Sequence, residues 1–154
     1  MSEFARTRNS YDGAEKSKRL YPALPDPLEV GTYDNHTHLE IADGDEPLSV
    51  AQHIEMMRQV NMLGAVQVGV TLESSKYSAE IAAREPMLLA AVAIHPNEAP
   101  LYGSLNELDD AILEIAELAK LPRVRAVGET GLDYFRTQGD EALSMQQHSF
   151  EQHI

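Results

Sequence analysis

From Leu28 onward the chain alternates short apolar runs with longer amphipathic segments, and this alternation limits its fold more than any other feature. The run MLLAAVAI over 87–94 is nearly continuous in apolar residues, as expected of a strand buried on both faces of a sheet. The segment 104–120 instead spaces its apolar residues at helical intervals, and it opens with Ser104 and Glu107 in capping-box spacing. Strands that alternate with helices in this way predict an α/β fold around a parallel sheet.

The same reading divides the chain into four strand–helix units. We expect strands over 30–35, 65–70, 87–94 and 124–129, and helices over 48–64, 73–85, 104–120 and 141–154. The first of these helices is expected to end at Gly64, because glycine commonly terminates helices.

The beginning of the chain has a different composition from the rest. Residues 1–26 are polar and then rich in proline, and Pro22 and Pro25 favour extended backbone. We therefore interpret 1–26 as a flexible N-terminal extension and 27–154 as one domain.

Composition excludes several classes of site. The chain has no cysteine, so it has no disulfide, thiolate zinc site or cysteine nucleophile, and a bound metal must rely on imidazole and carboxylate groups. Its net charge of −13 and pI near 4.7 argue against a broad basic surface for nucleic acid. The sequence shows neither a signal peptide nor a run of about 20 apolar residues, so we expect a cytoplasmic location and no membrane partner.

Two histidines, His36 and His38, stand two residues apart where the first expected strand ends. Side chains two apart on a strand point the same way, so both imidazoles should project from its carboxyl end, where parallel β/α folds place their sites. Neutral imidazoles are good ligands for zinc, manganese or iron. Taken alone, this pattern fits a pair of surface histidines in a loop equally well.

Later strands end in side chains of the same kind. His95 follows the third expected strand and Glu129 follows the fourth. A carboxylate facing a buried sheet is costly unless it is paired or bound to a metal, and one carboxylate can bridge two cations about 3.5–4 Å apart. The recurrence predicts a metal site with Glu129 as the candidate bridge. The remaining histidines fall among polar neighbours on expected helices, where surface positions are expected: His53, His148 and His153.

Three blocks, DNHTHLE, AIHPNEA and VGETGLDYFR, occur in this order and resemble the signature blocks of the TatD-type metal-dependent hydrolases, a deoxyribonuclease family. The resemblance covers roughly residues 30–154, and SMQQHSFEQHI is similar to the glutamine-containing helix that follows these blocks in the family. It implies a fold of the (β/α)8 TIM-barrel type. This chain would supply roughly the first four β/α units of that barrel.

By position, the resemblance implies that His36 and His38 bind one metal ion and that Glu129 is a catalytic residue bridging two divalent ions, Mg, Mn or Zn. It also implies supporting or phosphate-contacting roles for five further residues: Asp34, His95, Asp133, Tyr134 and Arg136. In the family an aspartate follows the histidine–leucine pair, and this chain has Glu40 there.

Several of these supporting residues also have simpler explanations. Asp34 is equally suited to capping a loop, Tyr134 and Phe135 to packing, and Arg136 to a solvated surface position.

The implied function is hydrolysis of phosphodiester bonds with DNA as the substrate and no obligate protein partner. A full barrel takes about 250 residues, so residues 27–154 amount to roughly half of one and we expect a truncated sequence. The two histidines and the late aspartate that complete the family's metal site have no matching blocks here. A half-barrel exposes a sheet edge, so self-association of a chain of this length is also expected.

Two alternatives remain at this point. One is an amidohydrolase-like enzyme acting on cyclic amides or esters, because such enzymes also carry H-x-H after the first strand, although GETGLDYF argues against it. The other is an inactive, truncated remnant that retains metal binding.

Overall fold

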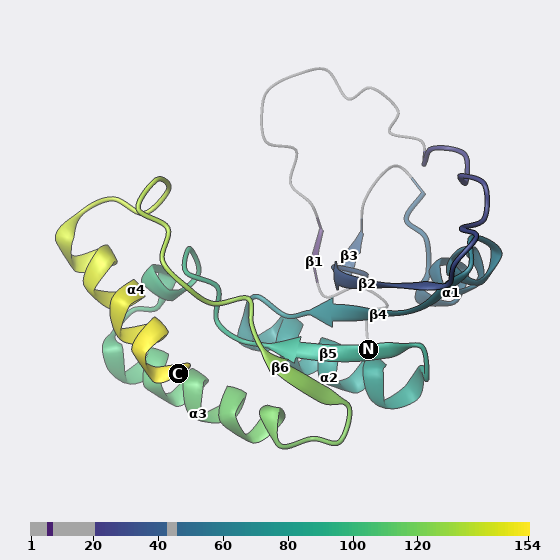
Figure 1. The fold of residues 1–154 in the computed structure, drawn as a ribbon. Helices are drawn as coiled ribbons and strands as arrows, with labels where there is room; N and C mark the ends of the chain where they lie inside the picture. Colours follow the sequence, from purple (N-terminus) through teal and green to yellow (C-terminus); the bar gives the residue numbers. More distant parts are fainter. Residues whose placement is uncertain (1–5, 8–20, 43–45) are drawn as a thin grey trace.

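The protein is described by a computed structural model that covers residues 6–7, 21–42 and 46–154. Its centre is a four-stranded parallel sheet in which the strands lie in chain order (Figure 1). The strands are β2 (Thr32–Thr37), β4 (Met62–Val68), β5 (Leu88–Val92) and β6 (Val124–Val127). Two short strands, β1 (Arg6–Thr7) and β3 (Ile41–Ala42), pair in parallel as a separate sheet. The predicted α/β fold with a parallel sheet is confirmed.

A helix follows each strand of the main sheet. These helices are α1 (Val50–Gln59), α2 (Leu72–Arg84), α3 (Leu105–Ala119) and α4 (Asp140–Gln152), and a short 3-10 helix, η1 (Ala99–Leu101), precedes α3. Helix α1 packs on β4, α2 on β4 and β5, and α3 on β5 and β6, while α4 lies against η1 and α3. These helices pack along the strands. The loops that carry the predicted site residues therefore lie at the carboxyl ends of the strands.

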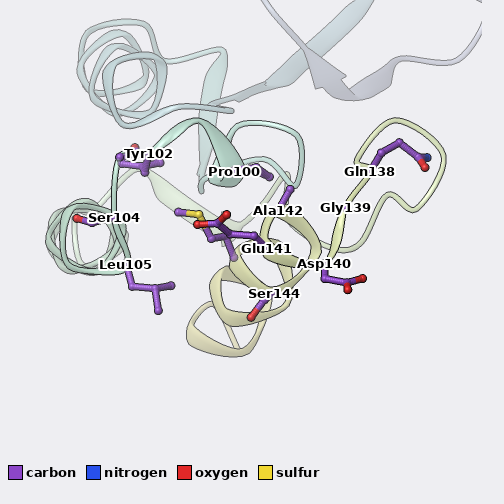
Figure 2. Close-up of a pocket in the computed structure, with 12 residues that line it drawn as sticks. Pro100, Tyr102, Ser104, Leu105, Gln138, Gly139, Asp140, Glu141, Ala142 and Ser144 are labelled. Carbon is purple, nitrogen blue, oxygen red and sulfur yellow. The ribbon is translucent and has the colours of Figure 1, made fainter.

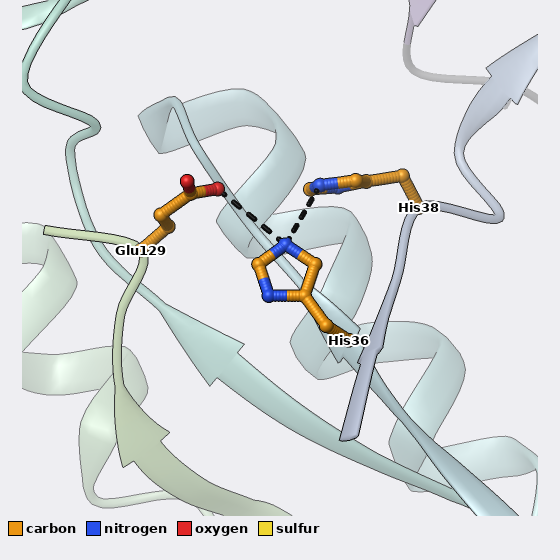
Figure 3. A group of neighbouring side chains, drawn as sticks. All are labelled: His36, His38 and Glu129. Atoms are coloured by element: carbon orange, nitrogen blue, oxygen red, sulfur yellow. Dashed lines mark hydrogen bonds and ion pairs between the residues drawn. The ribbon is translucent and has the colours of Figure 1, made fainter. Parts of the chain in front are cut away.

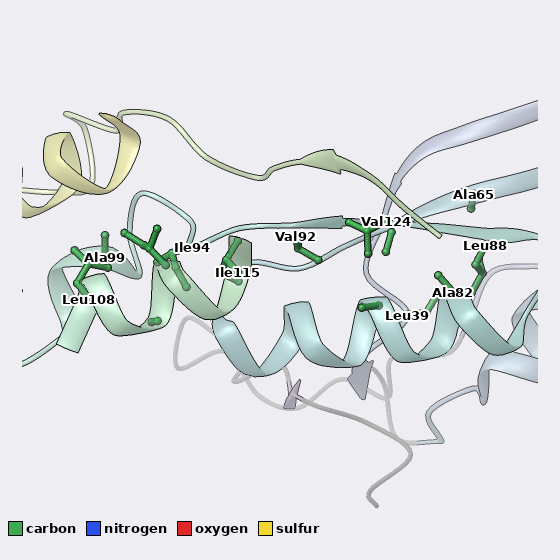
Figure 4. Packing of buried hydrophobic residues seen from close by; sticks show 14 of the residues in the cluster. Leu39, Ala65, Ala82, Leu88, Val92, Ile94, Ala99, Leu108, Ile115 and Val124 are labelled. Carbon is green, nitrogen blue, oxygen red and sulfur yellow. The ribbon is translucent and has the colours of Figure 1, made fainter. Parts of the chain in front are cut away.

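The core lies between the sheet and helices α1 to α3 (Figure 4). Leu88 and Val92 of β5 are fully buried, as the apolar run predicts, and they meet Ile54 of α1 and Leu108 of α3 in one cluster. Burying each such side chain contributes about 1.5–3 kcal/mol relative to exposure. The cluster thus fixes the strands whose ends carry the candidate ligands.

The prediction that Gly64 ends the first helix is wrong. Helix α1 ends at Gln59, the chain turns at Asn61 with a φ of 61°, and Gly64 lies inside β4. Asparagine tolerates this left-handed conformation. A Cβ at Gly64 would lie 2.7 Å from the Met87 carbonyl oxygen, so this glycine allows β4 to run close to β5.

Other expected boundaries move by at most three residues, and one cap differs from its pattern. Ser104 caps α3 by accepting a hydrogen bond from the Glu107 amide at 3.2 Å. The Glu107 carboxylate accepts from the Gly103 amide at 3.1 Å instead of completing the capping box at Ser104.

The expected N-terminal extension over 1–26 falls mostly outside the described residues. Residues 21–28 form neither helix nor strand and are exposed. None of the helices in the described parts of the chain has the length and apolar character needed to cross a membrane.

Candidate metal centre

Three of the predicted ligands converge at the carboxyl ends of β2 and β6 (Figure 3). The Nε2 atom of His36 lies 3.2 Å from Nε2 of His38 and 3.5 Å from Oε2 of Glu129, and the potential ligand atoms all lie within 4.8 Å of one another. Tetrahedral ligands bound at about 2.0–2.2 Å are separated from each other by about 3.4 Å. Two imidazoles and a carboxylate at these separations fit a divalent cation.

Local hydrogen bonds set the direction of the two imidazoles. The Asp34 carboxylate accepts a hydrogen bond from the His36 amide at 3.0 Å, so Asp34 fixes the backbone of the strand end. Nδ1 of His38 lies 3.0 Å from the Val68 carbonyl oxygen. A carbonyl only accepts, so Nδ1 carries the proton and Nε2 presents its lone pair to the cluster.

A buried carboxyl group, that of Glu40, lies next to the ring of His38. Glu40 is fully buried, and its Oε1 lies 3.4 Å from Nδ1 of His38. The side chain of Gln67, in β4, donates to Oε2 of Glu40 at 2.6 Å and accepts from the Leu39 amide at 2.7 Å. A buried carboxyl group is stabilised by such hydrogen-bond donors, so Glu40 links the packing of β4 to the ring of His38.

On the other side of the cluster, His95 holds Glu129. Nε2 of His95 lies 3.4 Å from Oε1 of Glu129, whereas the other carboxylate oxygen faces His36. Nδ1 of His95 accepts from the Asn97 amide at 3.0 Å, so in the neutral ring the proton sits on Nε2 and points to Glu129. In this arrangement His95 orients the carboxylate.

Asp133 is placed in the turn that follows Glu129, and its carboxylate bonds to that turn. It accepts from the amides of Phe135 at 3.0 Å and Arg136 at 2.9 Å, and from the Asn97 side chain at 2.9 Å. The hydrogen bond from the Arg136 amide, followed by that from Asn97, holds the pKa of Asp133 well below its usual range. Asp133 therefore shapes this loop and ties it to the loop after β5.

Gln146 of α4 joins the same two loops. Its side chain is fully buried, accepts from the Asp133 amide at 2.8 Å, and donates to the Pro96 carbonyl at 2.9 Å and to Oγ1 of Thr137 at 2.8 Å. Sequence reasoning identified neither Gln67 nor Gln146 as functional. The available signal for Gln67 was an amide inside the apolar run AVQVGV, and for Gln146 it was the resemblance of its helix.

The other predicted residues of this turn lie at the surface. Tyr134 is 55% exposed and Phe135 is 86% exposed, so the alternative that they are packing residues is wrong. Arg136 is largely solvated and forms an ion pair with Asp133 at 3.2 Å.

The three helix histidines do not join the cluster, but they are not simple surface residues. His53 is half-buried, and burial lowers its pKa. His148 lies 2.6 Å from a carboxylate oxygen of Asp109. Nε2 of His153 accepts from the Ile94 amide at 3.1 Å, next to His95, and burial lowers the pKa of His153.

A pocket of about 670 Å³ lies apart from the cluster, between η1 and the starts of α3 and α4 (Figure 2). Pro100, Tyr102, Leu105 and Met145 line it together with the acidic Glu141. Burial is the main cause that raises the pKa of Tyr102, followed by Glu98 and Glu114. None of the candidate metal ligands faces this pocket.

A parallel α/β chain with imidazole and carboxylate groups gathered at its strand ends has the features of a metal-dependent hydrolase. Residues 33–154 match the family described as TatD related DNase, and the chain belongs to this family.

Individual relatives agree with this assignment. The chain is 32% identical over 124 residues to the uncharacterized metal-dependent hydrolase TatD of Mycobacterium tuberculosis, a match covering 79% of this chain and 45% of that protein. It is 34% identical over 84 residues to the 3'-5' ssDNA/RNA exonuclease TatD of Musicola paradisiaca, covering 54% of this chain and 30% of that protein. The chain spans less than half the length of these relatives.

Among solved structures, the TatD homolog YjjV of Escherichia coli superposes with a TM-score of 0.56 at 23% identity, covering 79% of this chain and 44% of that one. This likeness supports the fold alone.

Proposed function

We propose that residues 27–154 form the N-terminal part of a TatD-type (β/α)8 barrel that hydrolyses phosphodiester bonds in DNA. The observation that carries the proposal is the convergence of His36, His38 and Glu129 from two strand ends, at separations that suit a shared cation. The family membership of the chain and the exonuclease name of one relative support the same chemistry.

Each residue has a defined task in this proposal. His36 and His38 bind one cation through Nε2, and Asp34 and the Val68 carbonyl keep the two imidazoles in place. Glu129 would bridge two ions: its Oε2 faces His36 on the side of the histidine pair, and His95 orients the carboxylate from the other side.

Divalent ions held there, Mg, Mn or Zn, supply Lewis-acid chemistry, because they acidify water and neutralise phosphate charge. The residues of this chain would hold these ions in position. Nε2–H of His95 orients Glu129, and the buried Glu40 lies 3.4 Å from Nδ1 of His38.

Metal binding is tested by calorimetric zinc titration of the 154-residue chain. We expect zinc binding that falls by at least about tenfold in His36→Ala, because one of three ligands is lost. Glu117→Ala, an exposed residue of α3, is the matched control and should bind zinc as the unchanged chain does. Absence of binding in the unchanged chain would contradict the metal site.

Hydrolysis is tested with a full-length protein that carries these blocks. It is given end-labelled single-stranded DNA in the presence of Mg, Mn or Zn, beside a cyclic amide and a cyclic ester. We expect nucleotide release from DNA that Glu129→Ala reduces by at least about a hundredfold, since both the bridging group and its charge are removed. Cleavage of the amide or ester in place of DNA would favour the amidohydrolase alternative. Zinc binding without any hydrolysis would favour the inactive remnant.

A further inference from the structure

Three apolar side chains are exposed within four residues of the loop that follows β6. Leu132 is 43% exposed, Tyr134 is 55% exposed and Phe135 is 86% exposed. Single exposed apolar residues are common on protein surfaces, but a cluster of them marks an interaction site more often. We refer to residues 132–136 as the aromatic turn.

The aromatic turn is held in one conformation by its own hydrogen bonds. The Asp133 carboxylate accepts from the amides of Phe135 and Arg136, and the Gln138 side chain donates to the carbonyl oxygens of Tyr134 at 3.2 Å and Phe135 at 3.1 Å. The Tyr134 hydroxyl is in turn bonded to the Gln147 side chain of α4 at 3.2 Å. The exposed rings therefore stand on a backbone prepared in advance, which lowers the entropic cost of binding.

Hydrogen bonds connect the aromatic turn to the metal cluster. Asn97 donates its side chain to Asp133 at 2.9 Å and its amide to Nδ1 of His95 at 3.0 Å. His95 in turn lies 3.4 Å from Glu129. Leu132 is three residues from Glu129, so the aromatic turn begins within about 11 Å of the metal cluster.

The positive charge of Arg136 also favours nucleic acid at the aromatic turn. Arg136 is the one lysine or arginine between residues 126 and 154 of a chain whose net charge is −13. Its side chain is 72% exposed, and its ion pair with Asp133 engages one of its nitrogens. An arginine keeps further donors for a phosphate in such an arrangement.

We propose that the aromatic turn binds a nucleobase of single-stranded nucleic acid, with Phe135 and Tyr134 stacking on the base and Arg136 pairing with a neighbouring phosphate. A single strand is required because its bases are free to stack on protein side chains, whereas bases in a duplex are not. This inference rests on the proposed function and names a substrate subsite for it.

The absence of tryptophan from the chain permits a direct test. Phe135→Trp introduces a single tryptophan at the aromatic turn, and its fluorescence is followed while an oligothymidylate is added in EDTA at low salt, so that no hydrolysis occurs. We expect quenching by the oligothymidylate and much weaker quenching by an abasic oligonucleotide of equal length and charge. Leu113→Trp, at an exposed position of α3, is the matched control and should not respond.

A second measurement uses the loss of the ring. In Phe135→Ala the affinity for the oligothymidylate, measured by fluorescence anisotropy, should fall about tenfold, as for the loss of one base–aromatic stack. Equal quenching by the two oligonucleotides, or unchanged affinity in Phe135→Ala, would overturn the subsite.

These results separate the subsite from the proposed hydrolysis. Base-dependent quenching without any nucleotide release would uphold the subsite and reject the hydrolysis. Nucleotide release without base-dependent quenching would uphold the hydrolysis and reject the subsite. If Phe135→Ala instead dissociates a dimer in sedimentation and the unchanged chain binds no oligonucleotide, the turn is a contact between copies and the subsite is rejected.

Discussion

Two fully buried glutamines support the candidate metal centre from opposite sides, and they differ in what they bond. Gln67 of β4 fixes the segment after β2 through the Leu39 amide, and Gln146 of α4 fixes the loops after β5 and β6 through the Asp133 amide. Gln67 also donates to the carboxylate of Glu40, whereas the partners of Gln146 are two backbone groups and a hydroxyl.

The two sides of the metal centre therefore depend on different kinds of interaction. The β2 side contains a buried carboxyl group, which is stable only while hydrogen-bond donors compensate its burial. The hydrogen bonds of Gln146 on the β5 and β6 side join neutral groups, so their loss leaves unsatisfied groups but no uncompensated charge. The first side should therefore be more sensitive to substitution.

The largest effect is expected for Gln67→Leu. It removes the amide that donates to Glu40 and the acceptor of the Leu39 amide. The free energy of unfolding should therefore fall by about 3–5 kcal/mol, because each buried group left without a partner costs about 1–3 kcal/mol and a carboxyl group costs more. Urea unfolding measures this change. Gln59→Leu, at an exposed position of α1, is the control and should stay within about 0.5 kcal/mol.

A smaller loss is expected for Gln146→Leu. The Asp133 amide and the Pro96 carbonyl lose their shared partner, and the expected cost is about 1–3 kcal/mol because both groups are neutral. The same urea experiment applies, with the exposed Gln152→Leu as the control. A loss equal to or larger than that of Gln67→Leu would break the comparison between the two sides.

The smallest expected effect is a pH dependence of the free energy of unfolding that comes from His153. Burial lowers the pKa of His153 below its ordinary value of 6.5, so between the two values the unfolded chain binds more protons than the folded one. Stability is therefore complete above pH 6.5 and falls as the pH drops through the lowered pKa, where protonation of Nε2 also breaks its bond to the Ile94 amide.

Urea midpoints at pH 7.5 and pH 5.0 test this dependence. The unchanged chain should lose more stability on acidification than His153→Gln, which lacks the titrating ring. An identical loss in both proteins would assign the pH dependence to other groups, such as the half-buried His53.

The features that sequence reasoning predicted correctly are those with a local physical cause. The apolar run 87–94 contains β5 because only a strand buried on both faces needs so many apolar residues in succession. His36 and His38 face each other because side chains two apart share a side of a strand.

The features that it missed depend on contacts distant in the sequence. Gln67 meets Glu40 across 27 positions, and Gln146 meets Pro96 across 50. Gly64 was expected to end a helix because its nearness to the Met87 carbonyl appears only once two strands are paired. Such pairings have no local pattern, so only the tertiary structure identifies the residues that support the site.

The order of the strands has a consequence for synthesis of the protein. In the main sheet β4, β5 and β6 each lie beside the strand of that sheet made just before them, so each of the three finds this neighbour already present. Chains emerge from the ribosome N-terminus first, at about 5–20 residues per second, so the sheet can assemble during translation by addition at one edge. The histidine pair at the end of β2 would then be in place before the codon for Glu129 is read.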